Sequence, residues 1–336
     1  MKVIVVGAGI VGASTAYHLA AAGAVVTVLD AGAIGAGASA KSFGWINASF
    51  AETPAYYRLR RAAIDHFRVL SQHLSLPSVR WNGALWWEDE GAAFDTQVAT
   101  LAARGYEAEV LDAAGFAALE PNVANPPPAC ILGRVEGAAD GDAIARALIA
   151  ASGAVVLVGC KVTAATTTTV QTSHGPMSAD HIVIAVGAAT GDLLTVPMDN
   201  QAGVIVHTAP VAPVVDHIIM SPDVHFRQAP DGRIVMGEIF SGGGLGARDA
   251  RDFSHDMLMR LRLRLPQIDL RIAAVNLGLR PVPADGLPCV GWVDGVYAAV
   301  MHSGITLGPL IGHLAAAEIM GTPQAALADF RPDRTR

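Results

Sequence analysis

"VVGAGIVGASTAYHLAAAGAVVTVLD", residues 5–30, decides the fold that we expect for this chain. A continuous aliphatic run over residues 2–6 is typical of a strand that is covered on both faces of a parallel sheet. The run leads into GAGIVG, residues 7–12, and then into a helical pattern that ends near Gly23. A second apolar run follows over residues 25–29. This order predicts a βαβ unit of the kind that binds a dinucleotide.

The glycines and the acid of this unit have separate tasks. Gly7 allows the tight turn, Gly9 lets the backbone approach a pyrophosphate, and Gly12 lets helix and strand pack closely. The helix N-terminus then offers unpaired N–H groups to the phosphates. Asp30, 18 residues after Gly12, stands where a carboxylate accepts the ribose hydroxyls and disfavours a 2′-phosphate.

A secretory signal is the competing interpretation of the opening. Such a signal needs a basic start, an unbroken apolar run and a small-residue cleavage site. Here only Lys2 precedes the run, and Tyr17 and His18 interrupt it. The apolar stretch 296–320 contains two histidines and a glutamate, which predicts a buried helix rather than a membrane span. We therefore expect a cytoplasmic protein without a membrane span.

Composition narrows the function classes further. The 336 residues suggest about two domains, and 52% hydrophobic with 35 glycines is typical of an α/β enzyme. A formal charge of −7 argues against nucleic acid as a partner. Cys130, Cys160 and Cys289 lie far apart without a CxxC pair, so we expect a reducing compartment, buried thiols and no metal site.

The next segment separates a flavin site from a nicotinamide site. "GAIGAGASAKSFGWINAS", residues 32–49, is rich in Gly, Ala and Ser. That composition favours a backbone that lies against a large ligand, although a surface loop has the same composition.

The sequence resembles the D-amino-acid oxidase superfamily of FAD enzymes, which includes glycine and sarcosine oxidases and D-amino-acid dehydrogenases. The order and spacing of the matching pieces carry the resemblance. After the opening unit they are "GASAKSFGW" (37–45), "GALWW" (83–87), "EGAADGDAIARAL" (136–148), "HIVIAVGAATGDLL" (181–194), "GLRPVPADGLPCVG" (278–291) and "GVYAAVMHSGITLGP" (295–309).

The resemblance implies an α/β fold, with a Rossmann-like FAD-binding domain and a second, mainly antiparallel-sheet substrate domain. We expect a discontinuous FAD domain over 1–77, 136–197 and 277–336, and a substrate domain over 78–135 and 198–276. FAD should be noncovalent, because sarcosine-oxidase-type enzymes attach it through a C-terminal cysteine and no cysteine follows Cys289.

The resemblance also implies the FAD contacts. In the family a strand such as 296–300, a turn at 302–304 and a helix from Ile305 place donors at the flavin pyrimidine edge, where they stabilise negative charge on reduction. Lys41 stands where the family more often has arginine. The expected contact residues are Gly7, Gly9, Ile10, Val11, Gly12, Asp30, Ala31, Ala38, Ser39, Lys41, Ser42, Gly44, Trp45, Val162, Ala185, Gly187, Gly278, Arg280, Ser303, Gly304, Ile305 and Thr306.

Arg280 and His302 are the expected catalytic residues. Arg280 matches the carboxylate-binding arginine of the glycine and D-amino-acid oxidase branch, and its guanidinium would fix the substrate α-carbon. His302 would contact flavin or substrate, or pack in the core. The loop before His302 is shorter than in the family and lacks the substrate-binding arginine of glycine oxidases.

Two other groups of polar residues are interpreted as structural. His225 and Arg227 alternate with Phe226, as in an ordinary strand, although the segment resembles the family's substrate-covering hairpin. The helical spacing of the arginines between 56 and 70 predicts a solvated face, which comprises Arg58, Arg60, Arg61 and Arg68.

The implied reaction is oxidation of the C–N bond of a small amino acid or secondary amine by hydride transfer to flavin N5. The substrate would be a small molecule with a carboxylate. Two alternatives stay open: a 2-hydroxy-acid dehydrogenase, and a flavin-carrying subunit of a hetero-oligomeric dehydrogenase. Homo- and hetero-oligomers are both open.

Overall fold

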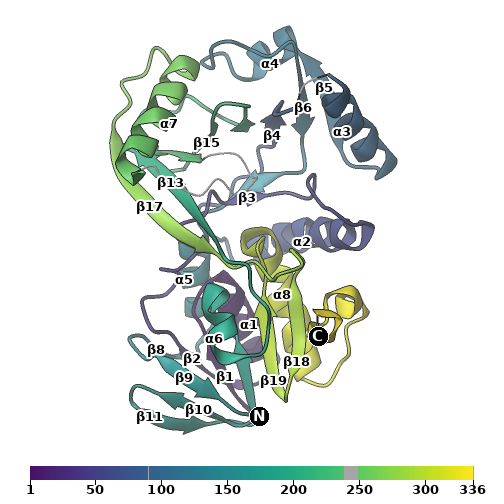
Figure 1. Ribbon diagram of the computed structural model, residues 1–336, viewed down its shortest axis with the longest axis vertical. Coiled ribbons are helices and arrows are strands. Elements are labelled where there is room, and N and C mark those ends of the chain that lie inside the picture. Colours follow the sequence, from purple (N-terminus) through teal and green to yellow (C-terminus); the bar gives the residue numbers. More distant parts are fainter. Residues whose placement is uncertain (90, 238–248, 336) are drawn as a thin grey trace.

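Two sheets form the two lobes of the molecule, which are stacked along its long axis (Figure 1). The computed structural model describes residues 1–89, 91–237 and 249–335. The lower lobe in Figure 1 is built on a six-stranded sheet and the upper lobe on an eight-stranded sheet. The predicted α/β fold with a second, mainly antiparallel sheet is confirmed.

The six-stranded sheet has the order β18-β19-β12-β1-β2-β8. All neighbours are parallel except β18, which pairs antiparallel with β19. The predicted strands 2–6, 25–29 and 296–300 have the expected bounds. The strands are β1 (Lys2–Val6), β2 (Val25–Leu29), β8 (Val155–Leu157), β12 (His181–Ile184), β18 (Cys289–Val293) and β19 (Val296–Val300).

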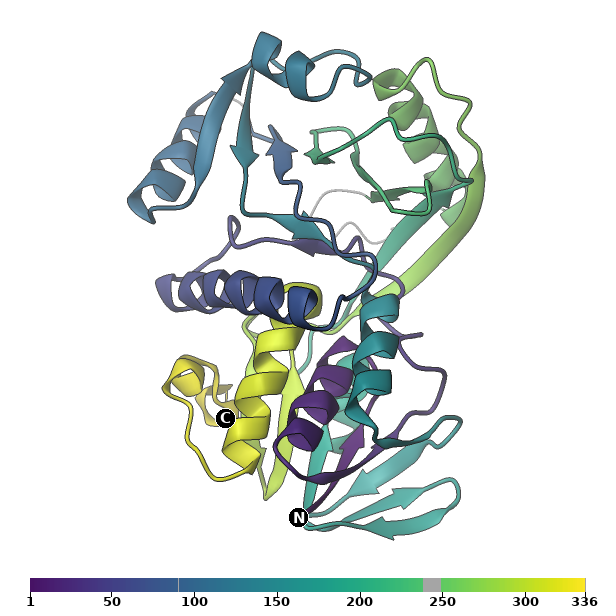
Figure 2. The same cartoon turned by 180° about the vertical axis from the view of Figure 1, so that it is seen from behind.

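Helices cover one face of this sheet and a small meander covers the other (Figure 2). The helices are α1 (Ile10–Ala21), α5 (Gly141–Ser152) and α8 (Gly304–Ile319). The meander comprises β9 (Val162–Ala165), β10 (Thr169–Thr172) and β11 (Gly175–Ser178). Val162 and Val170 of the meander pack against Ile4, Ile182 and Ile184 of the sheet.

The eight-stranded sheet has the order β17-β13-β16-β15-β14-β4-β6-β5 and is antiparallel except where β14 runs parallel to β4. Helix α7 (Ala250–Arg264) covers it with Phe253, Met257 and Leu261. The strands are β4 (Ala84–Trp86), β5 (Ala108–Asp112), β6 (Ala129–Gly133), β13 (Gln201–Thr208), β14 (Ile218–Met220), β15 (His225–Gln228), β16 (Ile234–Gly237) and β17 (Ile272–Arg280).

Helix α2 (Pro54–His73) lies between the lobes, beside the two-stranded sheet of β3 (Trp45–Ile46) and β7 (Gly137–Ala138) (Figures 1 and 2). The Thr53 hydroxyl caps α2 by accepting from the Tyr56 N–H. The remaining elements are α3 (Ala92–Ala103), α4 (Ala113–Leu119), α6 (Thr190–Leu193) and the 3₁₀ helices Gly187–Ala189, Ala325–Phe330 and Pro332–Thr335.

The predicted domain boundaries stay a prediction. The boundary before residue 277 falls inside β17, whose nine residues form one continuous strand. The predicted substrate segment 198–276 includes residues 238–248, which lie outside the described residues.

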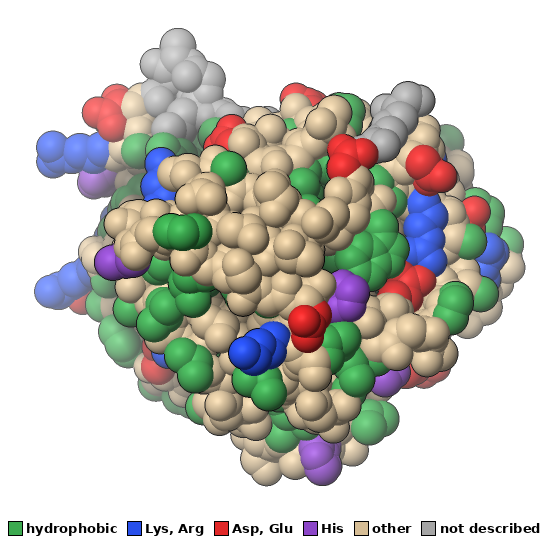
Figure 3. Space-filling model, turned by 90° about the horizontal axis from the view of Figure 1, so that it is seen from below, with side chains coloured by type: hydrophobic (Ala, Val, Ile, Leu, Met, Phe, Trp, Pro, Cys, Tyr) green, Lys and Arg blue, Asp and Glu red, His purple; other side chains and the backbone are tan. Residues whose placement is uncertain are grey.

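Figure 3 shows the lower lobe from below, with Lys and Arg side chains scattered among apolar and acidic ones. No helix within the described ranges is long and apolar enough to cross a membrane. In the same ranges no group of three or more His, Cys, Asp or Glu side chains is arranged to hold a metal ion.

Three histidines meet where α1, α2 and α8 pack together. The ring centroids of His18, His66 and His313 lie 5.1–5.5 Å apart. Burial first, and then the neighbouring imidazoles, lower the pKa of His18 to about 3 and that of His66 to about 4. The Nε2 atoms of both rings are buried and have no hydrogen-bond partner among the described residues. The helix junction therefore favours the neutral imidazole at His18 and at His66.

This cluster predicts that acid destabilises the fold. A folded-state pKa below the unfolded value near 6.5 contributes stability that is fully present above pH 6.5 and is lost as pH falls toward the folded pKa. Between pH 7 and pH 5 the unfolded chain takes up a proton at His18 that the folded protein does not. We expect the free energy of unfolding to fall by about 1–2 kcal/mol over this range because of His18, after allowance for its partial solvent exposure. Chemical denaturation at the two pH values measures this loss.

The double substitution His18→Gln and His66→Gln should make the decline between pH 7 and pH 5 shallower. His174→Gln, at an exposed histidine, is the matched control and should leave the decline unchanged. Equal declines in the two variants would contradict the assignment.

Candidate active site

A long cavity of about 480 Å³ follows the carboxyl ends of the parallel strands in the lower lobe. Its walls come from the turn between β1 and α1, the end of β2, the segment 37–42, the start of β9 and the first turn of α8. The site therefore lies where ligands bind in open α/β sheets, beyond the carboxyl edge of the strands.

The backbone between β1 and α1 leaves no room for a side chain at Gly7 or Gly12. Gly7 has a φ of +104°, and a Cβ there would lie 2.3 Å from the Ala185 carbonyl oxygen. A Cβ on Gly12 would lie 1.9 Å from the Gly7 carbonyl oxygen. The glycine spacing predicts that strand, turn and helix pack closely, and Gly7 and Gly12 show this packing.

Asp30 and Ser39 tie the loops around this cavity. The Asp30 carboxylate accepts hydrogen bonds from the N–H groups of Ala8 and Gly32, both at 2.7 Å. The Ser39 hydroxyl accepts from the N–H of Ile10 at 3.0 Å, at the N-terminus of α1. An acid at the end of β2 and a hydroxyl at the helix N-terminus therefore face the same cavity.

The structure brings most of the predicted FAD contacts together. Gly12 lines neither this cavity nor the next, and its contribution is the packing described above. The predicted residues that line the long cavity are Gly7, Gly9, Ile10, Val11, Asp30, Ala31, Ala38, Ser39, Ser42, Val162, Ala185, Gly187, His302, Gly304 and Ile305. Their roles as contacts stay a prediction.

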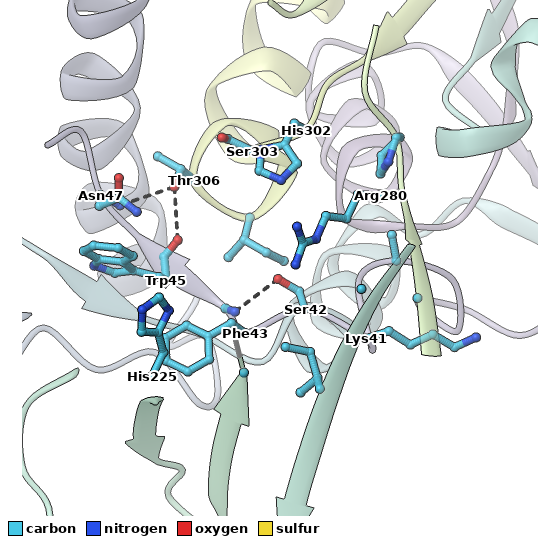
Figure 4. A pocket seen from close by; sticks show the side chains of 18 of the residues that line it. Lys41, Ser42, Phe43, Trp45, Asn47, His225, Arg280, His302, Ser303 and Thr306 are labelled. Atoms are coloured by element: carbon cyan, nitrogen blue, oxygen red, sulfur yellow. Dashed lines mark hydrogen bonds between the residues drawn. The ribbon is translucent and has the colours of Figure 1, made fainter. Parts of the chain in front are cut away.

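A second, smaller cavity of about 130 Å³ adjoins the first and lies between the lobes (Figure 4). Five residues line both cavities: Ala38, Ser42, Pro281, His302 and Ile305. The other predicted residues lie here: Lys41, Gly44, Trp45, Gly278, Arg280, Ser303 and Thr306. Lys41 is exposed, and its side chain points away from the other labelled side chains in Figure 4.

Charge in the smaller cavity has one sign. Its charged lining residues are Lys41, Arg60 and Arg280, and no aspartate or glutamate is among its described lining residues. In a protein with a formal charge of −7, this surface favours an anionic group on a bound small molecule.

Arg280 ends β17 and directs its guanidinium into the cavity (Figure 4). Within the described ranges no carboxylate pairs with it, and burial alone lowers its pKa from the usual value. Gly203 on β13, which pairs with Gly278 of β17, makes room for it, because a Cβ on Gly203 would lie 2.8 Å from Arg280 Nε. Sequence analysis did not identify Gly203.

His302 lies beside Arg280 at the boundary of the two cavities (Figure 4). Burial, followed by the charges of Arg280 and Arg60, lowers its pKa to about 4. The imidazole is therefore neutral at pH 7, and it can donate from one ring nitrogen and accept at the other.

Arg60 corrects the prediction of a solvated arginine face on α2. Arg58 is exposed as expected, but Arg60 is 4% exposed and lines the smaller cavity. The signal was its spacing, because Arg60 continues the buried helical stripe of Tyr56, Ala63 and Phe67. Its guanidinium bonds the Asn47 carbonyl oxygen, the Asn47 side chain, the Phe50 carbonyl oxygen and Ser303 Oγ.

Trp45 forms one wall of the smaller cavity and is held by a buried carboxyl group. Its indole N–H donates to Glu136 Oε2 at 2.8 Å, and the Tyr106 hydroxyl donates to Glu136 Oε1 at 2.5 Å. Burial raises the pKa of Glu136 to about 7. Sequence analysis missed Glu136, which no local pattern distinguishes from a surface acid.

His225 and Arg227 lie on β15, as the strand interpretation predicts, and both are buried. Arg227 donates to Asp140 Oδ1 at 2.7 Å and to the Phe43 carbonyl oxygen at 2.6 Å, which is a structural role. His225 contacts Glu88 and lines the smaller cavity. His225 is therefore both a strand residue and a part of the wall of the smaller cavity.

Comparisons with known proteins agree with this geometry. A family model described as FAD dependent oxidoreductase (DAO) matches residues 2–318. A glycine oxidase of Pseudomonas putida is 25% identical over 331 residues, which cover 91% of this chain and 88% of that protein. The crystal structure of glycine oxidase from Geobacillus kaustophilus has a TM-score of 0.85 at 21% identity and covers 98% of each chain. That of iminodiacetate oxidase from Chelativorans sp. BNC1 has a TM-score of 0.85 at 24% identity, again over 98% of each chain.

The close approach at Gly12 predicts the effect of a single added methyl group. Alanine is favoured over glycine inside a helix, so Gly12→Ala would stabilise an isolated α1. We expect it instead to lower the free energy of unfolding by about 1–3 kcal/mol, because the Cβ overlaps the Gly7 carbonyl. Chemical denaturation checks this result. In the control Gly32→Ala, the Cβ makes an ordinary contact at 3.6 Å and should cost little; equal losses would refute the packing argument.

Proposed function

Because the chain belongs to the FAD dependent oxidoreductase (DAO) family, we propose that it oxidises the carbon–nitrogen bond of a small amino acid or secondary amine that carries a carboxylate. The Pseudomonas putida relative is named glycine oxidase, which supports a small amino acid as substrate. The observation that carries the proposal is the guanidinium of Arg280, which has no carboxylate partner among the described residues and lies in the cavity that adjoins the long one.

The long cavity fits FAD, the cofactor of the family. The turn at Gly7 and Gly9 has no side chain at these two positions and leads into the N-terminus of α1, where backbone N–H groups can receive phosphates. Asp30, at the end of β2, would accept hydrogen bonds from the ribose hydroxyls, and Val162 lines the same long cavity. We assign the FAD contacts to the predicted residues that line this cavity, and the flavin end to the boundary at His302 and Ile305.

FAD, when bound, supplies the acceptor for the hydride that leaves the substrate α-carbon. The protein supplies orientation: Arg280 would hold the substrate carboxylate through paired N–H donors and so fix the α-carbon. The imine that remains after hydride loss is hydrolysed by water to a keto acid or an aldehyde. No residue is required to remove a proton from carbon in this scheme.

The charges around the smaller cavity also affect the protonation state of the substrate amine. A substrate amine must be neutral before its α-hydrogen leaves as hydride, and the fields of Arg280 and Arg60 disfavour the ammonium form. Neutral His302 adds no charge at pH 7. Because no aspartate or glutamate is among the described residues that line the smaller cavity, the field there stays positive.

We expect Arg280→Met to lower kcat/KM at least about 100-fold, mainly through KM, because it removes both the charge and the paired donors that hold the carboxylate. Steady-state kinetics with the best amine substrate measures the change. Arg271→Met, at an exposed arginine just before β17, is the matched control and should change kcat/KM less than about twofold. A loss of similar size in both variants would rule out a substrate role for Arg280.

A substrate panel tests the proposed function itself. Under anaerobic conditions, glycine, sarcosine, D-alanine, proline or iminodiacetate should bleach the visible absorbance of the holoprotein within the time of a steady-state assay. Bleaching only by 2-hydroxy acids would replace the proposal with a hydroxy-acid dehydrogenase. No bleaching by any of these compounds would remove the amine proposal.

A further inference from the structure

The hydroxyl of Ser303 receives two hydrogen bonds at the start of α8. The Tyr56 hydroxyl donates to Ser303 Oγ at 3.0 Å, and Arg60 Nη1 donates to the same oxygen at 3.2 Å. A serine oxygen has two acceptor sites and one proton, so both acceptor sites are occupied. No described residue accepts the Ser303 proton, and Ser303 is one of the residues that line the smaller cavity.

The first turn of α8 offers further donors at the same place. Ser303 precedes the helix but makes no side-chain capping bond to it. Within the described ranges, the N–H groups of Ile305 and Thr306 find no acceptor, as is normal for the first turn of a helix. Ile305 lies at the boundary of both cavities. The partial positive charge of the helix N-terminus therefore faces the proposed flavin end.

Arg60 places a full positive charge behind these donors. Its side chain is buried, its ring neighbour is Tyr56 at 5.3 Å, and its other contacts are neutral oxygens of Asn47, Phe50 and Ser303. No carboxylate of a described residue lies within ion-pair distance. Glu136 is the buried acid whose pKa the Arg60 charge lowers, but burial keeps that pKa near 7, so Glu136 offsets the charge only in part. A charge without a direct counter-ion acts strongly on a neighbouring ligand, because little water screens it.

We propose that Arg60 is a positioning residue whose positive charge, delivered through Ser303 and the first turn of α8, stabilises the negative charge that the flavin gains on reduction. The proposal rests on the assignment of the flavin end to the boundary at His302 and Ile305. Tyr56 helps to orient the Ser303 hydroxyl, because its own hydroxyl donates a second hydrogen bond to the Ser303 oxygen. Arg60 does not touch the substrate in this role, and four of its five N–H donors are already used.

The reduction potential of the bound flavin tests this role. It is measured in holoprotein by anaerobic equilibration with a redox dye, without any amine, so the result does not depend on the proposed substrate. Arg60→Gln should lower the equilibrium constant for two-electron reduction at least about tenfold, which equals a fall of about 30 mV. Arg60→Lys keeps the charge and should stay within about threefold of the parent value.

Arg58→Gln removes the same charge from the exposed face of the same helix and is the matched control. Its equilibrium constant should stay within about twofold of the parent value, because solvent screens that charge. Equal potentials in the Arg60→Gln and Arg58→Gln variants would overturn the proposal. So would an Arg60→Lys variant that behaves like Arg60→Gln, since that result would assign Arg60 to packing alone.

Asn47→Asp decides the question if Arg60→Gln does not fold or does not retain FAD. The Asn47 side-chain oxygen lies 2.5 Å from Arg60 Nη2, so aspartate keeps the shape and the hydrogen bond and adds a counter-charge. We expect the equilibrium constant for reduction to fall at least about fivefold. An unchanged constant in Asn47→Asp holoprotein would refute the proposal without removal of Arg60.

Discussion

The structure depends on how closely the backbone passes itself at the turn between β1 and α1. Gly7 lies against the carbonyl group of Ala185, just after β12, and Gly12 lies against the carbonyl group of Gly7. Neither glycine has space for a Cβ atom. Because this turn is so tight, α1 leaves the sheet at once and its N-terminus stays open toward the long cavity. The same helix then packs against α5 and α8, which fixes the rest of the lower lobe.

Local patterns explain which parts of this molecule sequence analysis could predict. The strands 2–6, 25–29 and 296–300 are short apolar runs between turn residues, and their bounds were right. The fold and the FAD family followed from the order of such pieces. Parallel pairing of β14 with β4 brings together residues 218 and 84, and nothing in either segment announces that contact. Long-range pairing was therefore predictable only through the resemblance.

The candidate site divides in the same way. Gly7, Asp30 and Arg280 stand in recognisable motifs, and the structure places them along the two adjoining cavities. Arg60 was assigned to a solvated face because charged residues on a helix are usually exposed. Its burial depends on Asn47 and Ser303, which lie 13 and 243 residues away. A side chain whose neighbours come from other elements carries no local signal of its surroundings.

Arg280 belongs by backbone to the upper sheet, and its guanidinium enters the cavity between the two lobes. Strands β13 and β17 run from one lobe toward the other as a two-stranded arm, with Gly203 and Gly278 paired near its tip (Figure 1). Under the proposed function, this arm sets the distance between the substrate carboxylate and the cofactor. The proposed alignment of substrate and cofactor would then depend on how α7 packs against the upper sheet, although α7 contributes no residue to the pocket.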